Sequence, residues 1–525
     1  MYLKDSNLNR KDFYFLGAII ILSLILSVYY IDFNMKLGIY CSDIYVYLLN
    51  ALYFTGTNIN STQTISLSPV ICFLTSILFQ FGLKDQIAIL IISAIFAIFG
   101  NIGLYLLFKT KFNEILSFCG VILYSTSAIY LTWFANGSVD IPAVSITIWI
   151  VLLEIMAIKT NPKYYQILIP TIAIGFFTRY TIILILPVLA LYYLYNKGFK
   201  IEKTDLKYLL RGVLFGLITT AIILIPLMNM GNGYLGANAQ ISNGMSGDKG
   251  SVTDLAYNTD ISYYLVNFLN FISATKIIFA NRTPVLENPS IQSFVVLAIL
   301  TIGSLLFIVK NKFEAKKEKI IGIIILLIAL LSFNHISSFI TIILAFMGLL
   351  LVGKDSSNKN GIVMLSWILV YLIFFSYYSI KVNRYILPTI PPLAYLILAS
   401  VELIHEKIKI NTNILPIILI ALFLIQGFTL CLAFEDTNQF TAPHEMSDYI
   451  KSEIPDYENQ TIGVYNMRPY HWYLGKNVTG IESNATTDIA NANITYYISD
   501  IAKNDLNNFK ELKTIDKLYL YEKTI

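Results

Sequence analysis

The sequence has few of the residues that build the usual metal and nucleophile sites. Its four cysteines have no paired spacing, its four histidines are scattered without an HExxH pattern, and there is no glycine-rich phosphate loop. Three of the cysteines lie in or beside apolar runs, so we interpret the cysteines as small packing residues rather than as a metal site or a disulfide framework. The sequence therefore predicts no metal site and no firmly bound cofactor, although it leaves a dependence on a divalent metal open.

Charged residues are scarce as well. Only 13% of the 525 residues are Asp, Glu, Lys or Arg, whereas 56% are hydrophobic, and the mean hydropathy is +0.65. No soluble globular protein needs that much apolar surface, so the composition is typical of an all-α polytopic membrane protein. The net charge of +4 gives no indication of a nucleic-acid partner.

Long apolar runs divide the chain into membrane crossings. The first run, Phe13 to Ile31, follows Lys4, Arg10 and Lys11 and has no small-residue cleavage site after it, so it predicts a retained signal anchor with a cytoplasmic N-terminus. Further single crossings are predicted at 86–108, 114–131, 141–158, 208–229, 291–309, 361–379, 385–404 and 413–433.

Two other apolar runs, 163–195 and 320–352, are too long to cross only once. A helix of about 33 residues rises nearly 50 Å, whereas the bilayer core is about 30 Å thick. Basic residues flank both ends of each run, so under the positive-inside rule each run turns back, near Arg179 and near 332–338. The apolar stretch 66–82 is predicted to lie on the outer surface or to re-enter. The total is about thirteen crossings, with the C-terminus outside.

This topology defines two predicted domains. A transmembrane domain covers 1–434, with outer loops at 32–85 and 230–290, and an extracytoplasmic α/β domain covers 435–525. The second loop starts as a mobile Gly- and Asn-rich segment, 231–239, and continues as an interfacial amphipathic helix over Tyr257–Phe279. In the α/β domain, helices are predicted near 443–453 and 504–512, and strands at 461–465, 494–498 and 517–521. All seven Asn-x-Ser/Thr sequons lie in segments predicted to be outside.

The stretch from Tyr40 to Tyr53 follows the first crossing and carries an acid. At helical period it has an apolar stripe, with Ser42 as the predicted N-cap and Asp43 in the first turn. The pattern is typical of a helix on a membrane surface. Because a carboxylate at the lipid interface is costly unless it is needed, we predict that Asp43 is a catalytic base. The alternative is that Asp43 only interacts with the helix dipole.

Four other ionisable residues are predicted on the outer face. Asp140 precedes the fourth crossing, Arg179 lies at an outer turn, and Lys381 and Arg384 lie between two late crossings, against the positive-inside tendency. Each has a structural alternative. Asp140 is also a suitable N-cap before Pro142. Arg179 is also suited to snorkel from a tight turn, and the last two cations to bind lipid phosphates.

Two acids and three cations on one face match the needs of sugar transfer from a lipid-linked donor. A polyprenyl phosphate is a good leaving group once cations hold its charge, and guanidinium groups bind phosphate oxygens bidentately. The acceptor hydroxyl needs a carboxylate that takes its proton while the sugar carbon is attacked from the opposite face. The set therefore predicts an inverting transferase. A glycosidase would instead need two carboxylates that flank the bond.

Four features, in matching order over nearly the whole chain, resemble the GT-C superfamily of polyprenyl-phosphate-sugar glycosyltransferases, in particular its protein O-mannosyltransferase and lipid A aminoarabinose transferase branch. They are the acidic helix from Ser42 to Leu48, the segment Leu78-Phe-Gln-Phe-Gly82, the turn Thr178-Arg-Tyr180, and the run Arg384-Tyr-Ile-Leu-Pro-Thr-Ile-Pro-Pro392.

The resemblance implies a role for each of these ionisable residues. Asp43 would be the base and Asp140 a second site acid, and three cations would surround the lipid phosphate: Arg179, Lys381 and Arg384. Tyr40, Tyr47 and Tyr385 are further candidate substrate contacts. Many relatives carry two adjacent acids in the first loop, whereas here Ile44 follows Asp43. That departure leaves any acceptor or metal contact of a second acid unassigned.

The expected protein is thus a cell-membrane enzyme whose active site and C-terminal domain are extracytoplasmic. Its expected partners are a polyprenyl-phosphate-linked sugar, membrane lipids, and an acceptor that is a protein, a glycan or a lipid. A lipid transporter or flippase is an alternative, but the sequence shows no repeats or paired interrupted helices. An oligosaccharyltransferase would have a larger terminal domain and a Trp-Trp-Asp-type motif. A catalytically inactive relative that serves as a scaffold is the third alternative.

Overall fold

The computed structural model describes residues 8–57, 68–227, 260–280, 283–310, 316–333, 335–353, 359–408, 413–433, 438–503, 505–506 and 508–524. The chain forms two compact units. The first unit contains 1–28, 93–135 and 139–434, and the second contains 29–92, 136–138 and 435–525. The second unit therefore combines the predicted C-terminal domain with the whole of the predicted first outer loop, 32–85. The predicted mobile segment 231–239 lies outside the described residues.

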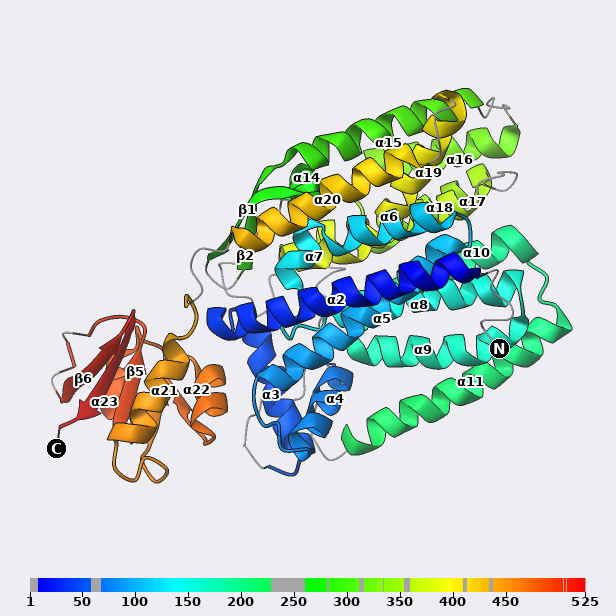
Figure 1. Ribbon diagram of the computed structural model, residues 1–525. Coiled ribbons are helices and arrows are strands. Elements are labelled where there is room, and N and C mark those ends of the chain that lie inside the picture. Colours follow the sequence, from blue (N-terminus) through cyan, green and yellow to red (C-terminus); the bar gives the residue numbers. More distant parts are fainter. Residues whose placement is uncertain are drawn as a thin grey trace. The chain divides into compact units, whose positions relative to one another are not determined.

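The first unit is mostly helical, and its long apolar helices run side by side, as α15, α19 and α20 do in Figure 1. Two of its helices extend into segments of the second unit: α2 (Arg10–Leu37) and α5 (Ile87–Lys109). The other elements of its first half are α6 (Glu114–Ser125), α7 (Ala128–Trp133), α8 (Asp140–Lys159), η1 (Pro162–Tyr164), α9 (Tyr165–Thr178), η2 (Tyr180–Ile185), α10 (Leu186–Lys197), α11 (Lys203–Leu224) and η3 (Ile225–Leu227).

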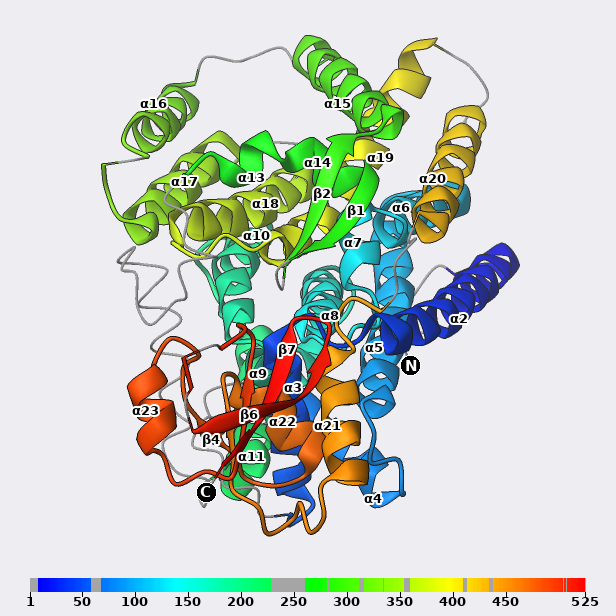
Figure 2. The same cartoon turned by 90° about the vertical axis from the view of Figure 1, so that its left-hand side faces the viewer.

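The second half of the first unit adds further helices and one strand pair. Its elements are α13 (Tyr263–Val266), α14 (Phe268–Ile272), β1 (Ala274–Ala280), β2 (Thr283–Pro289), α15 (Ile291–Lys310), α16 (Lys317–Leu331), α17 (Ser338–Gly353), α18 (Lys359–Tyr377), η6 (Asn383–Thr389), α19 (Ile390–Ile408) and α20 (Ile414–Leu432). Figure 2 shows the β1–β2 ribbon beside α14, which contacts β2.

Each predicted crossing contains an apolar helix. Among the described residues, nine helices are long and apolar enough to cross a membrane, and the other predicted crossings contain the shorter helices α6, α9, α16 and α17. The count of thirteen crossings therefore stays a prediction. Both long apolar runs do break at the predicted turns. Arg179 is extended (φ −157°, ψ 121°) between α9 and η2, and α16 and α17 pack against each other on either side of the second break.

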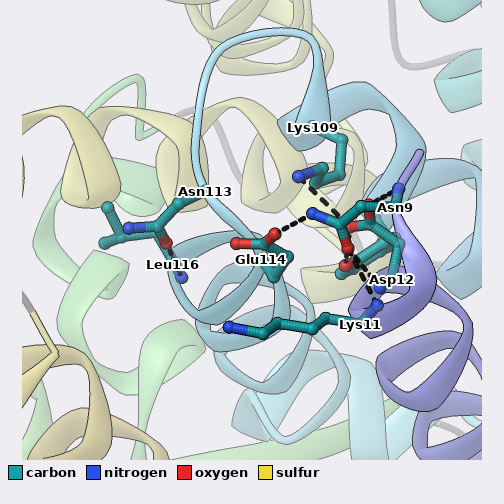
Figure 3. A network of polar contacts seen from close by, with 8 residues as sticks. Asn9, Lys11, Asp12, Lys109, Asn113, Glu114 and Leu116 are labelled. Atoms are coloured by element: carbon teal, nitrogen blue, oxygen red, sulfur yellow. Dashed lines mark hydrogen bonds and ion pairs between the residues drawn. The ribbon is translucent and has the colours of Figure 1, made fainter. Parts of the chain in front are cut away.

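A polar network fastens the start of α2 to α5 and α6 (Figure 3). The fully buried carboxylate of Asp12 accepts a hydrogen bond of 2.6 Å from the Tyr105 hydroxyl and lies 3.1 Å from the Lys109 ammonium. The backbone N–H of Asn9 donates to the other carboxylate oxygen of Asp12 at 2.7 Å, and the side-chain amide of Asn9 donates to Glu114. The N-terminal helix is therefore held by a buried, paired carboxylate in addition to apolar packing.

We expect Asp12→Ala to destabilise the protein by about 3–5 kcal/mol, because it leaves the Lys109 charge and the Tyr105 hydroxyl without their buried partner. Tyr105→Phe should cost less, about 1.5–3 kcal/mol, because it removes one hydrogen bond to a charged group. Thermal unfolding in detergent measures both. Asp32→Asn is the matched control, since Asp32 forms an exposed pair with Lys36 on the same helix. Equal midpoints for Asp12→Ala and this control would contradict the assignment.

The second unit contains two helices from the first outer loop and a small α/β domain. Its elements are α3 (Ser42–Phe54), α4 (Pro69–Gln80), α21 (Ala442–Glu453), β3 (Ile462–Val464), α22 (Met467–Leu474), β4 (Thr479–Gly480), α23 (Thr486–Asn491), β5 (Tyr496–Ser499), β6 (Phe509–Ile515) and β7 (Leu518–Lys523). The sheet order is β4-β3-β5-β7-β6, in which β3 pairs parallel with β4 and β5 and the other pairs are antiparallel. The predicted helix near 443–453 and the three predicted strands are confirmed.

Two predicted helices are wrong. The segment predicted as a helix at 504–512 contains strand β6, which pairs with β7 across a tight turn at Asp516 (φ 52°). The described part of the predicted interfacial helix over Tyr257–Phe279, residues 260–279, forms two short helical turns and then strand β1, which pairs antiparallel with β2. In both places hydrogen bonding to a neighbouring strand overrides a local sequence pattern that is compatible with a helix.

Candidate active site

In the first unit, one buried carboxylate joins two arginines from distant parts of the chain. Asp140 is the first residue of α8 and is 1% exposed. One of its carboxylate oxygens forms an ion pair with Arg179, and the other lies 3.6 Å from Nη1 of Arg384 in η6. Each arginine side chain is only 12% exposed. The structure therefore brings together three of the predicted site residues, in a cluster with a formal charge of +1.

Aromatic rings frame the two guanidinium groups. The Tyr385 ring centroid is 5.1 Å from Cζ of Arg179 and 5.7 Å from Cζ of Arg384. The Trp133 ring lies 5.3 Å from Cζ of Arg384, and its indole N–H donates to Asn383 at 2.9 Å. Cation–π contacts of this kind hold a guanidinium plane in place while leaving its edge N–H groups for an anion. We call Asp140, Arg179, Arg384, Tyr385 and Trp133 the arginine cluster.

The geometry argues against two structural alternatives. The N-cap of α8 is Val139, without a capping side-chain hydrogen bond, so Asp140 lies within the helix and is not its N-cap. The mostly buried side chain of Arg179 faces Asp140 and does not snorkel outward.

Lys381 differs from its neighbour Arg384. Its ammonium group donates to three backbone carbonyls at the end of α18 and beyond, Phe375 at 3.1 Å, Ser376 at 2.6 Å and Tyr378 at 2.5 Å. Burial lowers the pKa of Lys381 to about 8, and Asp260 acts in the opposite direction. All three ammonium hydrogens are thus used within the protein. This lysine stabilises the turn that leads into η6 and is not presented to a ligand.

In the second unit, Asp43 lies in the first turn of α3, as predicted, but the helix differs from the expectation in two ways. The N-cap is Cys41 rather than Ser42. Residues Ile44 to Leu52 are all buried, so α3 is covered on every side and is not a half-exposed surface helix. The Asp43 side chain is 30% exposed, and one carboxylate oxygen lies 3.8 Å from Nη1 of Arg468 on α22.

The other two tyrosines of the prediction are buried in the second unit. The Tyr40 hydroxyl accepts a hydrogen bond of 2.7 Å from the Asn136 amide, and the amide oxygen of Asn136 accepts one from the backbone N–H of Ser138. Tyr47 is buried on α3. Because Asn136 is only 3% exposed, its sequon is not accessible for glycosylation in the folded protein.

The chain is similar to known proteins in part of its sequence and in its overall fold. Residues 66–225 match the family described as dolichyl-phosphate-mannose-protein mannosyltransferase. The fold is similar to ArnT from Cupriavidus metallidurans in the apo state, with a TM-score of 0.58, 10% identity, and coverage of 96% of this chain and 97% of that chain. The same values hold for ArnT bound to undecaprenyl phosphate. The chain has a GT-C fold.

A second GT-C structure is also similar. The Archaeoglobus fulgidus oligosaccharyltransferase in the apo form has a TM-score of 0.50 and 13% identity, over 93% of this chain and 70% of that chain. No curated protein sequence gives a significant match. The GT-C resemblance predicted from the sequence and the predicted fold class, an all-α membrane domain with a small α/β domain, are therefore confirmed.

Two residues that contact the candidate site residues were not predicted from the sequence. Trp133 lies just after the apolar run 114–131, among further apolar residues, where nothing distinguishes it from a packing residue. Arg468 lies in the α/β domain, where basic residues are ordinary. Only their tertiary contacts, of Trp133 with Arg384 and of Arg468 with Asp43, identify these two residues as candidates.

Proposed function

We propose that this GT-C protein is an inverting glycosyltransferase that moves a sugar from a polyprenyl-phosphate-linked donor to a hydroxyl acceptor. The observation that carries the proposal is the arginine cluster, in which one carboxylate holds two shielded guanidinium groups and leaves one positive charge in excess. A phosphodiester carries one negative charge and complements that excess. The family match at 66–225 and the structural similarity to ArnT, whose bound form holds undecaprenyl phosphate, support a lipid phosphate as the donor's anionic part.

The cluster is suited to a leaving group whose charge grows during the reaction. In the donor, the phosphate links the polyprenol to the sugar; when its bond to the anomeric carbon breaks, the phosphate leaves as a monoester with an additional negative charge. Guanidinium groups fixed by Asp140 and by aromatic rings strengthen their interaction as that charge develops, which lowers the barrier. In this assignment Arg179 and Arg384 hold the phosphate, and Asp140 and Lys381 position them.

The proposed base is Asp43. Its carboxylate takes the proton of the acceptor hydroxyl while the hydroxyl oxygen forms a bond with the anomeric carbon, and the electron pair of the broken carbon–oxygen bond leaves with the phosphate. Attack from the side opposite the phosphate inverts the anomeric centre. Asp43 is partly exposed, as a group that receives a proton from an incoming acceptor must be. In the proposed orientation the N-terminus is cytoplasmic, and the active site and the C-terminal domain lie outside.

The test uses the full chain purified in detergent. Radiolabelled polyprenyl-phosphate-linked hexoses and pentoses are supplied with a membrane extract from the source organism as acceptor, and release of polyprenyl phosphate is measured. We expect release for at least one donor and saturable binding of undecaprenyl phosphate or dolichyl phosphate alone. Scrambling of fluorescent lipids in liposomes, without sugar transfer from any donor, would instead favour a transporter.

Lys381 gives this activity an expected pH dependence. Below its pKa of about 8 the ammonium group has three N–H groups for three carbonyls, whereas the neutral amine above that pH has two. Because the turn leads directly to Arg384, we expect the transfer rate to fall as the pH rises through about 8. Lys381→Arg keeps its charge throughout this range, so its pH–rate profile should lack the alkaline decline. Identical declines in the two proteins would contradict this role.

A further inference from the structure

The α/β domain contributes an arginine to the helix that carries the proposed base. Arg468 lies in the first turn of α22, which begins shortly after β3 ends. Its Nη1 group donates a hydrogen bond of 3.1 Å to the Ser42 hydroxyl and lies 3.8 Å from a carboxylate oxygen of Asp43. These two residues are neighbours at the start of α3, and Arg468 is more than 420 positions away from them along the chain.

The position of α22 against α3 and α4 is strongly determined by aromatic contacts. Tyr473 of α22 packs edge-on against Tyr45 of α3 at 5.7 Å, and its hydroxyl donates to Gln86 at 3.1 Å. Trp472 stacks on Phe79 of α4 at 5.9 Å. These contacts fix the end of α22 that follows Arg468. The arginine therefore reaches Asp43 from a helix that is itself held in place on both α3 and α4.

The chain connection to the α/β domain is fixed in the same unit. The backbone N–H of Phe440 donates to the carbonyl of Leu37 at 3.0 Å, and Gly38 forms a parallel bridge with Phe440. Gly38 has φ +82°, and a Cβ atom there would lie 2.6 Å from the Phe440 backbone, so only glycine fits. The segment before α3 and the segment before α21 are thus joined through their backbones, and Gly38 lies shortly before Asp43 in the sequence.

We propose that Arg468 is a positioning residue for the base Asp43, an inference that rests on the proposed function. The positive charge of the guanidinium group attracts the Asp43 carboxylate, and one of its N–H groups donates a hydrogen bond to the neighbouring Ser42 hydroxyl. Together these contacts restrict the side-chain rotamers of both residues at the start of α3. The side chains of Arg468 and Asp43 are 34% and 30% exposed, so the pair is reachable from solvent and by an acceptor hydroxyl. A base held in one orientation spends more time in the geometry that accepts the proton.

The test compares kcat and KM of Arg468→Gln, Arg468→Lys and Asp43→Asn in the transfer assay. For Arg468→Gln we expect kcat to fall about 10- to 100-fold with the donor KM unchanged, because only the orientation of the base is lost. The kcat of Arg468→Lys should lie between those of Arg468→Gln and the wild type, because lysine keeps the positive charge but lacks the planar guanidinium group. Lys451→Gln, an equal charge change at an exposed position of α21, is the control and should leave both parameters unchanged.

A double-mutant cycle distinguishes positioning from a general effect on folding. If Arg468 acts through Asp43, Arg468→Gln should cause no further loss in the Asp43→Asn background, whereas damage to the fold would add to it. Additive losses, or an increase in acceptor KM with kcat unchanged, would overturn the proposal. Should Arg468→Gln fail to fold, Ser42→Ala removes the other contact of the arginine, and a full-rate Ser42→Ala together with a full-rate Arg468→Lys would overturn it as well.

The same cycle separates this inference from the proposed function. If Asp43→Asn retains the full transfer rate, the assignment of Asp43 as the base is wrong, and the proposed role of Arg468 is wrong as well. If Asp43→Asn is inactive and Arg468→Gln is fully active, only the inference about Arg468 is wrong. Binding of undecaprenyl phosphate should be unchanged in every variant of this pair, because the proposed phosphate ligands are Arg179 and Arg384.

Discussion

Asp43→Asn should lower the rate of sugar transfer by about 10²–10⁴-fold, the usual contribution of a positioned general base. Asparagine has nearly the shape of aspartate but does not accept a proton at neutral pH, so the acceptor hydroxyl would have to attack without proton removal. The donor is unaffected by this change, and binding of undecaprenyl phosphate should stay as in the wild type. The measurement is single-turnover transfer with excess enzyme, which reports the chemical step without product release.

Asp32→Asn is the appropriate control for this prediction. Asp32 belongs to the same compact unit and its carboxylate is also paired with a cation, Lys36 at 2.7 Å, but the pair is exposed on α2. Loss of an exposed pair has little effect on folding, and this variant should transfer sugar at the wild-type rate. A normal rate for Asp43→Asn would show that another group takes the proton, and the start of α3 would then have a structural role such as interaction with the helix dipole.

The parts of the fold that follow from local composition were predictable. Apolar runs of membrane length identify the crossings, and basic residues at both ends of a run require it to turn, so the breaks at Arg179 and between α16 and α17 follow from charge and length alone. Strand β6 was not predictable in this way. Its residues are compatible with a helix, and only pairing with β7 across the turn at Asp516 makes it a strand.

The site was predictable to the extent that charge in an apolar chain is costly. That cost identified Asp43, Asp140, Arg179 and Arg384 as residues that need partners. It could not distinguish Lys381 from Arg384, three positions apart, because the difference lies in the three carbonyls that surround the lysine ammonium in the folded chain. It could not identify Arg468 either, because a charge in a polar domain carries no comparable penalty.

Arg384→Gln is the second large expected effect, with transfer lowered about 10²–10³-fold, the usual cost of removing one preorganised donor to developing charge. Arg384→Lys should recover only part of the rate, because an ammonium group does not reproduce the planar fork or its contacts with Tyr385 and Trp133. Arg211→Gln is the matched control. Arg211 also lies near an aromatic ring, Tyr208 at 5.7 Å, but is exposed on α11 and outside the cluster.

Asp140→Asn distinguishes the proposed positioning role of Asp140 from the proposed phosphate binding by Arg179 and Arg384. Without the carboxylate, two shielded guanidinium groups are left uncompensated, and we expect a destabilisation of about 3–5 kcal/mol together with a loss of transfer. Undecaprenyl phosphate supplies the missing negative charge, so it should raise the unfolding temperature of Asp140→Asn more than that of the wild type. For Arg384→Gln the same lipid should raise the unfolding temperature less than in the wild type, because one phosphate ligand is gone. If the lipid stabilises all three proteins equally, the phosphate binds elsewhere, and the two arginines only compensate the charge of Asp140.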